Sequence, residues 1–392
     1  MIHLFLNGLG ASAGAGLTYL YNVLPQLSAL PSVRTTLAVQ PGVRGGFGDF
    51  PNVTLANGQV PVGTARRFWF EQRALPGLIR QSGAEVLISA GNFALRTSPV
   101  PQVLLSGNSL YTSRDFCRDL RSRSEYGIWA GTRFKGLLAR KSIHWAERTV
   151  APSRAFAEEL RRWTGKEVLA IHHGFDRGVF FADKSGLPDA VRQEVDAANG
   201  CLKLLFVSHY NYYRNFETLL RAIPLLRQAL AGRKVRVFLT CELRTGANPG
   251  AYRPERAAAI VEQLRIREEV VELGAVPYRL LHHLYRACDI YVTPAYTETF
   301  AHPLVEAMAS KLPIAAADLP VHREVCGDAA RYFPRFSPEK LAETVAGIAA
   351  STEVARQLIA AERSDAFSWR DHVAQLLEVA GSIRLRRAAA RD

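Results

Sequence analysis

The sequence predicts a doubly wound α/β protein built from two parallel-sheet domains. Short, continuously apolar runs alternate with segments whose apolar residues recur at helical spacing, which is typical of parallel strands covered by helices on both faces. This pattern occurs twice and fades in the polar stretch 174–200 between the two sets. The 392 residues also exceed what one core usually holds, since domains commonly contain about 100–200 residues. We therefore expect two Rossmann-like domains that face each other across a cleft.

In the first half, the alternation predicts five strands and three helices. The apolar runs that predict strands are 2–6, 86–89, 103–106, 149–152 and 168–172. The helical segments are 16–27, 136–148 and 154–163. Ser153 stands directly before the last of these, where a serine side chain can accept a hydrogen bond from a backbone N–H of the first turn. It is the predicted N-cap of that helix.

The second half repeats the scheme. The predicted strands are 202–207, 235–240, 270–273, 290–294 and 314–317. The clearest helix is 216–230, whose apolar residues fall on one face, namely Phe216, Leu219, Leu220, Ile223 and Leu226. Ligands of open parallel sheets bind beyond the carboxyl ends of the strands. The residues that follow each strand are therefore the ones to search for chemistry.

The composition is that of a globular chain with a basic surplus. Hydrophobic residues make up 48% and charged residues 22%, which argues against disorder and against a membrane-spanning protein. The 49 Lys and Arg exceed the 36 Asp and Glu by 13, which implies an anionic partner. Nucleic acid, an anionic membrane and a phosphorylated ligand all fit. The five cysteines include no C-x-x-C pair, and the chain shows no signal peptide and no long apolar run, so a cytoplasmic location is expected.

A glycine-rich loop, residues 7–16, follows the first predicted strand. Loops of this kind expose backbone N–H groups and the positive end of a helix dipole, so they suit phosphate. A nicotinamide site is excluded because it requires an acidic residue about 20 positions further on, and none occurs before Asp49. The alternative is a tight strand-to-helix turn that binds no ligand.

The segment 294–309 carries the strongest functional signal. Pro303 suits the first turn of a helix, and the N–H groups of Leu304 and Val305 would then be free to bind an anion. Glu298 lies on the loop before this helix and Glu306 about one turn into it. Carboxylates accept hydrogen bonds from hydroxyl groups, so this arrangement favours a ligand with hydroxyls next to phosphates, such as a sugar nucleotide. The alternative is that both glutamates are solvated surface residues.

This segment resembles the E-x7-E motif of the retaining GT-B glycosyltransferases of family four. The resemblance continues through residues 171–176, 206–220, 284–289, 311–325 and 327–333. It spans roughly residues 150–370, while the first 150 residues match the family more loosely. It implies a GT-B fold with an acceptor-side domain at 1–178, a nucleotide-sugar domain at 179–370 and a C-terminal helix, 371–392, that packs back on the first domain.

The resemblance also implies roles for single residues. Glu298 would contact the hydroxyls of the donor sugar near the anomeric centre, and Glu306 the ribose of the nucleotide. His209 and Arg214 stand where the family commonly has an Arg and a Lys that grip the diphosphate. A histidine is cationic only part of the time near neutral pH, so Arg214 is expected to carry most of the charge.

Two glycine positions of the family's donor loop are occupied by other residues. The loop here contains Phe300, Ala301 and His302, and the side chains at 299 and 301 are expected to limit how closely the backbone approaches the sugar. Gly14 and Gly16 match the family's N-domain loop, whose N–H groups face the diphosphate or the acceptor. The strand end 106–109 lacks the histidine that many relatives carry, so no acceptor-side base is assigned.

The reaction that the resemblance implies is transfer of a hexosyl group from a nucleotide-diphosphate sugar, with retention. The acceptor would be a saccharide or a lipid-linked molecule in the synthesis of surface polysaccharide or glycolipid. No metal is expected, since no Asp-x-Asp motif occurs, and no cofactor beyond the sugar nucleotide as co-substrate. The alternative is a catalytically silent GT-B scaffold or sensor of sugar nucleotides.

The basic surplus is concentrated in residues 114–148, where aromatic side chains are interleaved. Such a stretch can lie on an anionic bilayer, which would place the protein at the inner face of the membrane next to a lipid-linked acceptor. The alternative is an arginine-rich helix face in water. Nucleic acid is not an expected partner, because the sequence has no zinc-ligand spacing, helix-turn-helix signature or RNA-binding aromatic motif.

Overall fold

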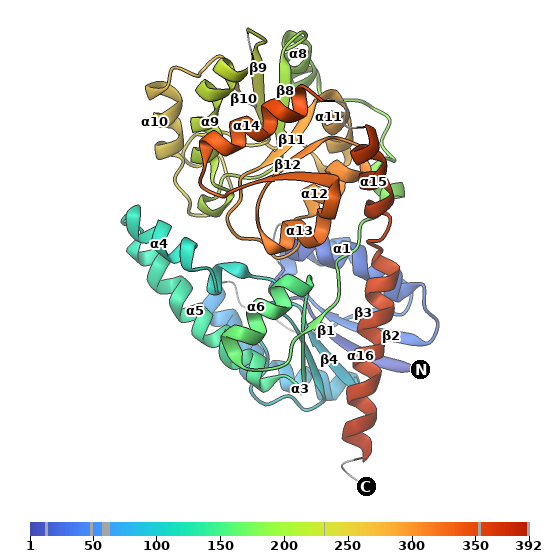
Figure 1. Cartoon of the computed structure of the whole chain (residues 1–392). Coiled ribbons are helices and arrows are strands. Elements are labelled where there is room, and N and C mark those ends of the chain that lie inside the picture. Colours follow the sequence, from blue (N-terminus) through green and yellow to red (C-terminus); the bar gives the residue numbers. More distant parts are fainter. Residues whose placement is uncertain (12–14, 48–49, 57–62, 231, 352–353, 390–392) are drawn as a thin grey trace. The chain divides into compact units, whose positions relative to one another are not determined.

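The computed structural model describes the chain except for residues 12–14, 48–49, 57–62, 231, 352–353 and 390–392. The chain divides into two compact units, each built on one parallel sheet (Figure 1). Unit 1 comprises Met1–Ser113, Leu120–Gly174 and Ser368–Asp392. Unit 2 comprises Arg114–Asp119 and Phe175–Phe367.

Unit 1 contains a seven-stranded sheet in the order β3-β2-β1-β4-β5-β6-β7, with every pairing parallel. Its strands are β1 (Ile2–Asn7), β2 (Val33–Ala38), β3 (Val53–Leu55), β4 (Val86–Ser89), β5 (Gln102–Leu105), β6 (Arg148–Ala151) and β7 (Leu169–Ala170). The central strands are buried apolar runs: Leu4–Asn7 of β1 and all of β4 lie inside. This burial explains why the sequence shows them as continuous rather than alternating patterns.

Helices cover both faces of this sheet. They are α1 (Ala15–Ser28), α2 (Thr64–Arg73), α3 (Leu75–Ser82), α5 (Tyr126–Trp145), α6 (Arg154–Thr164) and α16 (Trp369–Ala389), with 3₁₀ turns η1 (Pro41–Gly46) and η2 (Ser109–Tyr111). The helix α4 (Arg114–Ser122) has residues in both units. Ser153 caps α6 as predicted, since its Oγ accepts a hydrogen bond from the backbone N–H of Phe156 at 3.2 Å.

The C-terminal helix α16 belongs to the core of unit 1. One face of it is buried against α1 and the sheet, through Trp369, Val373, Leu376, Ala380 and Ile383. The spacing of these residues, three and four apart, is that of a single helix face. Burying each of the larger side chains contributes about 1.5–3 kcal/mol, so the last segment of the chain stabilises the first domain.

Unit 2 contains a six-stranded parallel sheet in the order β10-β9-β8-β11-β12-β13. Its strands are β8 (Leu202–Phe206), β9 (Val235–Leu239), β10 (Val270–Glu272), β11 (Ile290–Thr293), β12 (Ile314–Ala317) and β13 (Ala330–Phe333). Its helices are α7 (Arg177–Phe180), α8 (Asp189–Ala197), α9 (Phe216–Ala229), α10 (Glu255–Gln263), α11 (Leu281–Ala287), α12 (His302–Ala309), α13 (Pro320–Cys326), α14 (Pro338–Ala349) and α15 (Val354–Ser364). The 3₁₀ turns are η3 (Tyr212–Arg214), η4 (Tyr278–Leu280) and η5 (Gly327–Ala329).

Each sheet reverses its winding direction once. In unit 1 this happens between β1 and β4, and in unit 2 between β8 and β11. Crossover connections run to opposite sides from such a point, so the loops after the two strands diverge and leave room for a ligand. The two carboxyl edges beside these switch points are therefore the places where a site is expected.

Some elements were not expected from the sequence. The strand β2 was missed because Thr35 and Thr36 interrupt its apolar run, although both are buried in the structure. The helix α5 begins at Tyr126 rather than at residue 136. Three glycines, at 127, 131 and 136, weaken the helical signal of this segment, because glycine costs about 1 kcal/mol relative to alanine in a helix.

The chain leaves unit 1 and returns to it at adjacent points. The backbone N–H of Phe175 donates to the carbonyl of Phe367 at 3.1 Å, so the two ends of the long segment of unit 2 are joined to each other. One residue earlier, Gly174 lies so close to Trp369 that a Cβ would stand 2.1 Å from its backbone nitrogen. No side chain other than that of glycine fits at this position.

Candidate functional site

The switch point of unit 2 brings two predicted site residues together. Arg214 ends the 3₁₀ turn that follows β8, and Glu298 lies on the loop that follows β11. Because β8 and β11 are neighbours in the sheet, these loops share one edge, and the Arg214 guanidinium forms an ion pair with the Glu298 carboxylate. Only 19% of the arginine side chain and 9% of the glutamate side chain are exposed.

The environment of Arg214 keeps it charged. Burial is the largest single influence and acts to lower the pKa of Arg214, but Glu298, Tyr213 and Tyr291 together outweigh it, and the pKa is raised. The guanidinium also lies over the Tyr213 ring, 5.2 Å from its centroid, where a cation is attracted to the aromatic face. The family resemblance implies that Arg214 binds a diphosphate and Glu298 a sugar. In the structure the two side chains form an ion pair with each other.

Glu306 lies on the buried side of α12. It is 4% exposed, and its Oε2 accepts a hydrogen bond from the Tyr285 hydroxyl at 2.8 Å. Burial raises the pKa of Glu306 to about 7, although the Tyr285 hydroxyl acts in the opposite direction. Tyr285 comes from α11, 21 positions before Glu306, and no sequence pattern predicts that the two residues are in contact.

One expectation about the donor loop is corrected. The N–H of Leu304 is not free, because it donates to the carbonyl of Ala301 at 3.0 Å and so closes the first turn of α12. The Phe300 ring is 1% exposed and packs against Phe367 and His302, with ring centroids 5.2 and 4.9 Å apart. Its side chain is a core residue, and only its backbone remains available to a ligand. The Val305 side chain is likewise fully buried.

Ala301 occupies a position that favours glycine. Its φ is 66°, in the left-handed region that costs an ordinary residue about 1–2 kcal/mol. The family's glycine at this place would adopt the same conformation without that cost. Relative to glycine, the alanine therefore adds strain and one methyl group at this position.

His209 follows β8 on the same edge and is exposed. Loss of hydration, and then the positive charge of Arg214, lower the pKa of His209. Its ring is therefore neutral at neutral pH. Of the two basic residues that the sequence assigns to a diphosphate, Arg214 supplies the permanent charge.

The glycine loop of unit 1 lies at the other switch point. Gly14 lies outside the described residues. A Cβ at Gly16 would stand 3.1 Å from the Cα of Ala11, and one at Gly10 would stand 3.1 Å from the Cα of Gly91, on the loop after β4. The loops after β1 and β4 thus approach each other closely at Gly10 and Gly91, where a Cβ on Gly10 would make a tight contact.

A second arginine–glutamate pair lies at this edge of unit 1, and sequence reasoning missed it. Arg67 and Glu71 are one turn apart on α2, with 3.6 Å between Nε and Oε1 and side-chain exposures of 15% and 6%. Burial raises the pKa of Glu71 to about 7, although Arg67 and the Asn7 side chain act to lower it. The i, i+4 spacing was the available signal.

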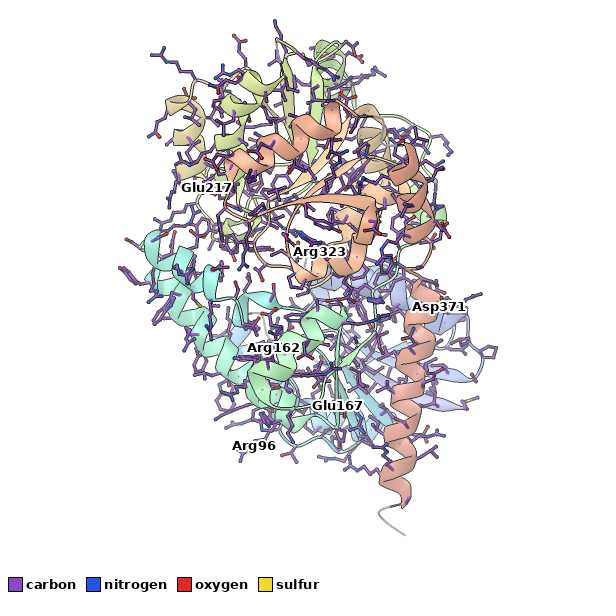
Figure 2. All side chains as sticks on the ribbon, viewed as in Figure 1. Arg96, Arg162, Glu167, Glu217, Arg323 and Asp371 are labelled. Atoms are coloured by element: carbon purple, nitrogen blue, oxygen red, sulfur yellow. The ribbon has the colours of Figure 1, made fainter. Side chains whose placement is uncertain are left out.

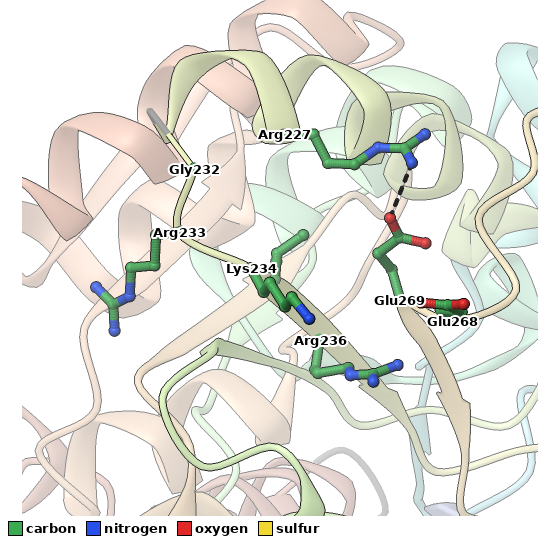
Figure 3. Close-up of a pocket in the computed structure, with 8 residues that line it drawn as sticks. Arg227, Gly232, Arg233, Lys234, Arg236, Glu268 and Glu269 are labelled. Atoms are coloured by element: carbon green, nitrogen blue, oxygen red, sulfur yellow. Dashed lines mark ion pairs between the residues drawn. The ribbon is translucent and has the colours of Figure 1, made fainter.

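A cavity of about 290 Å³ lies at the opposite edge of the unit 2 sheet, and Figure 3 shows its lining. Lys234 precedes β9, Val235 and Arg236 begin it, and Glu268 and Glu269 precede β10, so the cavity is at the amino ends of these strands. Arg227 forms an ion pair with Glu269 at 3.1 Å. Ligands of parallel sheets bind at the carboxyl ends, so this cavity is not the candidate site.

The basic stretch 114–148 includes an exposed face of α5. Tyr126, Phe134 and Leu137 are 62%, 63% and 58% exposed and lie on one side of the helix. The exposed basic residues on the same helix are Arg133, Lys135, Arg140 and Lys141. Within the described part of the chain, no helix is both long and apolar enough to cross a membrane. Among the same residues, no cluster of three or more His, Cys, Asp and Glu side chains could hold a metal ion.

Residues 189–365 match the family described as glycosyl transferases group 1. The chain is also 32% identical over 130 residues to D-inositol 3-phosphate glycosyltransferase of Nocardia farcinica, a match that covers 33% of this chain and 28% of that protein. It is 28% identical over 216 residues to the protein of the same name from Corynebacterium glutamicum, covering 53% and 50%. The aligned part is thus half or less of these relatives.

The likeness to solved structures extends over the whole chain. Sucrose-phosphate synthase from Thermosynechococcus elongatus superposes with a TM-score of 0.71 at 15% identity, covering 100% of both chains. Anabaena HepE in complex with UDP-glucose superposes with a TM-score of 0.70 at 14% identity, covering 97% of this chain and 100% of that one. At these identities the likeness concerns the fold, which is GT-B.

Proposed function

Residues 189–365 form a glycosyltransferase domain of group 1, and from this premise we propose that the chain transfers a sugar from a nucleotide-diphosphate sugar to an acceptor hydroxyl, with retention at the anomeric carbon. The bond between the anomeric carbon and the diphosphate breaks, and a bond to the acceptor oxygen forms. The acceptor proton leaves with the nucleoside diphosphate or with solvent. The further proposals that the sugar is a hexose and the product a surface polysaccharide or glycolipid rest on the family resemblance.

The observation that carries this proposal is the convergence of Arg214, Glu298 and Glu306 on one sheet edge. One cation and two carboxylates at a switch point suit a ligand in which an anionic diphosphate lies between two groups that bear hydroxyls. A nucleotide sugar has this pattern, with a ribose on one side and a sugar on the other. A simple phosphate would be repelled by the two carboxylates.

Each residue then has a distinct role. Arg214 stabilises the negative charge that develops on the departing diphosphate, which is the main electrostatic demand of the reaction. Glu298 orients the sugar by accepting hydrogen bonds from its hydroxyls, and Glu306 does the same for the ribose. Arg214 and Glu298 form an ion pair with each other, and the phosphate and hydroxyls of the donor would offer each of them a replacement partner.

The relatives indicate which substrates to test first. Anabaena HepE is described in complex with UDP-glucose, so UDP-glucose is the first donor. The curated relatives are described as D-inositol 3-phosphate glycosyltransferases, so D-inositol 3-phosphate belongs among the acceptors beside saccharides and lipid-linked sugars. The panel of nucleotide sugars described next identifies the base and the sugar of the donor.

The decisive experiment is a panel of UDP-, GDP- and ADP-sugars. Thermal stabilisation by one nucleotide, and slow release of free sugar from the corresponding donor, are the expected results. Glu306→Gln should weaken the stabilisation, whereas Glu268→Gln, at the opposite edge of the same sheet, should leave it unchanged. If no nucleotide sugar stabilises or is hydrolysed, the proposal is wrong.

The exposed face of α5 supports a peripheral place at an anionic membrane, where a lipid-linked acceptor would be found. Binding to vesicles that contain an anionic lipid, and weaker binding to neutral vesicles, are expected. Phe134→Ser and Leu137→Ser should reduce the binding, because both remove apolar area from this face. Equal binding by wild type and variants would indicate that this face of α5 is exposed to water and does not contact the membrane.

Two observations favour a second candidate, a GT-B protein that binds nucleotide sugars without turnover. Ala301 replaces a glycine of the donor loop, and the lowered pKa of His209 leaves the diphosphate site with one permanent cation. Binding of a nucleotide sugar without release or transfer of sugar, across broad acceptor mixtures, would support this candidate. Ala301→Gly that creates turnover would identify the loop as its cause.

A further inference from the structure

His322 is a buried histidine for which the proposed function so far has no use. It lies on α13 with no exposed surface, and its Nδ1 is 2.7 Å from the carbonyl oxygen of Ala317. A carbonyl oxygen only accepts, so Nδ1 carries the proton of this hydrogen bond. The next residue, Arg323, labelled in Figure 2, has a largely exposed side chain and pairs with Asp318. The histidine is thus the inward-pointing member of this turn.

The other ring nitrogen has no partner. In the neutral ring Nε2 is an acceptor, and in the described structure it is buried without a hydrogen bond. Burial lowers the pKa of His322, which keeps the ring neutral and this lone pair available. Buried polar groups are nearly always paired, so an orphaned acceptor indicates a partner that the ligand-free chain does not supply.

Arg214, at the same edge of the sheet, carries a hydrogen-bond donor that also has no hydrogen bond in the described structure. The Nε–H of Arg214 is also buried without a hydrogen bond among the described residues. His322 follows β12, Glu298 follows β11 and Arg214 follows β8, and these three strands are consecutive neighbours in the sheet, so the three residues lie at one carboxyl edge. The charges of Glu298 and Arg214 accordingly act on the pKa of His322, the first raising and the second lowering it. One unpaired acceptor and one unpaired donor therefore adjoin the residues that are proposed to hold the sugar.

The chemistry of the two atoms selects their partner. A group that satisfies both must accept a hydrogen bond from Arg214 and donate one to His322. A hydroxyl group does this, whereas a carboxylate or a fully ionised phosphate can only accept and an ammonium can only donate. A water molecule is the other source of the same chemistry.

We propose that His322 is a specificity-determining residue that reads one hydroxyl of the donor sugar, with Nε2 accepting from that hydroxyl while the Arg214 Nε–H donates to it. This inference rests on the proposed function. A donor would offer phosphate to Arg214 and a neighbouring hydroxyl to Glu298, at the sheet edge that His322 shares.

The test compares UDP-glucose, or the donor that the nucleotide panel selects, with its monodeoxy analogues at each sugar position. Wild type should lose about tenfold or more in kcat/KM or in affinity when one particular hydroxyl is missing, because the site's polar groups are then left unpaired. In His322→Asn this penalty should fall to within about threefold while the penalties at the other positions persist. Asparagine keeps the hydrogen bond to Ala317 through its amide nitrogen and removes only the acceptor at Nε2.

Controls separate this role from a merely structural one. His282→Phe is the matched control, because His282 is also fully buried in unit 2 with neither ring nitrogen in a hydrogen bond among the described residues, but packs against Phe180 and Phe181. It should leave the analogue pattern of wild type intact. If His322→Asn lowers the melting temperature but keeps the wild-type pattern, Nε2 holds a buried water only, and the inference is overturned. If wild type binds no nucleotide sugar at all, the proposed function itself fails.

Discussion

Both units carry an arginine–glutamate pair at the carboxyl edge of the sheet, but the pairs are built in different ways. In unit 1, Arg67 and Glu71 are one turn apart on a single helix. In unit 2, Arg214 and Glu298 come from the loops after two neighbouring strands, 84 residues apart. In each pair the arginine Nε is buried without a hydrogen bond in the described structure. The local pair keeps its geometry whatever binds, whereas the pair made from two loops can be opened.

The largest effect should follow from breaking the openable pair. Arg214→Gln removes the positive charge that faces the diphosphate, and donor hydrolysis should fall at least about 100-fold. Arg67→Gln leaves Glu71 without its partner and should lower the melting temperature. Initial rates with the donor alone and thermal unfolding of both variants measure this contrast. If Arg67→Gln reduces donor hydrolysis as strongly as Arg214→Gln, the distinction between the two pairs is wrong.

The next effect concerns pH. The pKa of Glu71 in unit 1 and of Glu306 in unit 2 is raised from 4.5 to about 7. Below pH 4.5 these two carboxyl groups are protonated in the folded and in the unfolded state, and their contribution to stability is fully present. As pH rises from 4.5 to about 7, the unfolded chain releases these protons first, so the free energy of unfolding should fall by a few kcal/mol.

Isosteric variants assign this slope to its residues. Glu71→Gln and Glu306→Gln should each remove part of it, and the double variant should remove more than either. Denaturant unfolding between pH 4.5 and 8 gives the measurement. Glu158→Gln is the control, since Glu158 is 53% exposed at its side chain and already paired with Arg161. An unchanged slope in the double variant would contradict the burial argument.

A smaller effect is expected on nucleotide affinity. Glu306→Gln keeps the shape of the side chain and the contact with Tyr285, but it loses the charge that strengthens a hydrogen bond from a ribose hydroxyl. The dissociation constant of the matching nucleoside diphosphate should rise about tenfold, equivalent to about 1.4 kcal/mol. Glu71→Gln, the corresponding change in unit 1, should leave it unchanged. Calorimetric titration distinguishes the two.

The smallest effect is one of backbone strain, and it should have opposite signs in the two units. Ala301→Gly in unit 2 relieves a left-handed φ of 66° and should stabilise the protein by about 1 kcal/mol. Gly165→Ala in unit 1 introduces the same strain at the end of α6, where φ is 72° and a Cβ would have no neighbour within 4 Å. It should destabilise by a similar amount. Melting temperatures that move in the same direction would refute this reading of Ala301.

The sequence predicts the elements of the fold whose signal is local. Ser153 was identified as a cap from the residues around it, and the strands that are continuous apolar runs were found within one or two residues. The strand β2 was missed because buried threonines do not differ from exposed ones in a hydropathy pattern. The family resemblance adds Arg214, Glu298 and Glu306 as members of one site, which spacing alone does not do.

The partners of these residues could not be predicted, because they depend on contacts between distant segments. The hydrogen bond of Tyr285 to Glu306 and the direct pairing of Arg214 with Glu298 arise only when neighbouring strands place their loops side by side. The same is true of His322, which stands in the sequence as one polar residue between Val321 and Arg323. The free N–H expected at Leu304 was wrong for a local reason, since the left-handed Ala301 turns its carbonyl toward that N–H.

The hydrogen bond between Phe175 and Phe367 joins the first and last residues of the long segment of unit 2. Apart from the short piece Arg114–Asp119, this unit is an insert whose ends already meet, so its removal or replacement would not require the surrounding chain to stretch. Modules with adjoining ends can be exchanged between proteins by recombination, one cut on each side. Under the proposed function, a change of donor could therefore be made by exchanging unit 2 while unit 1 is kept.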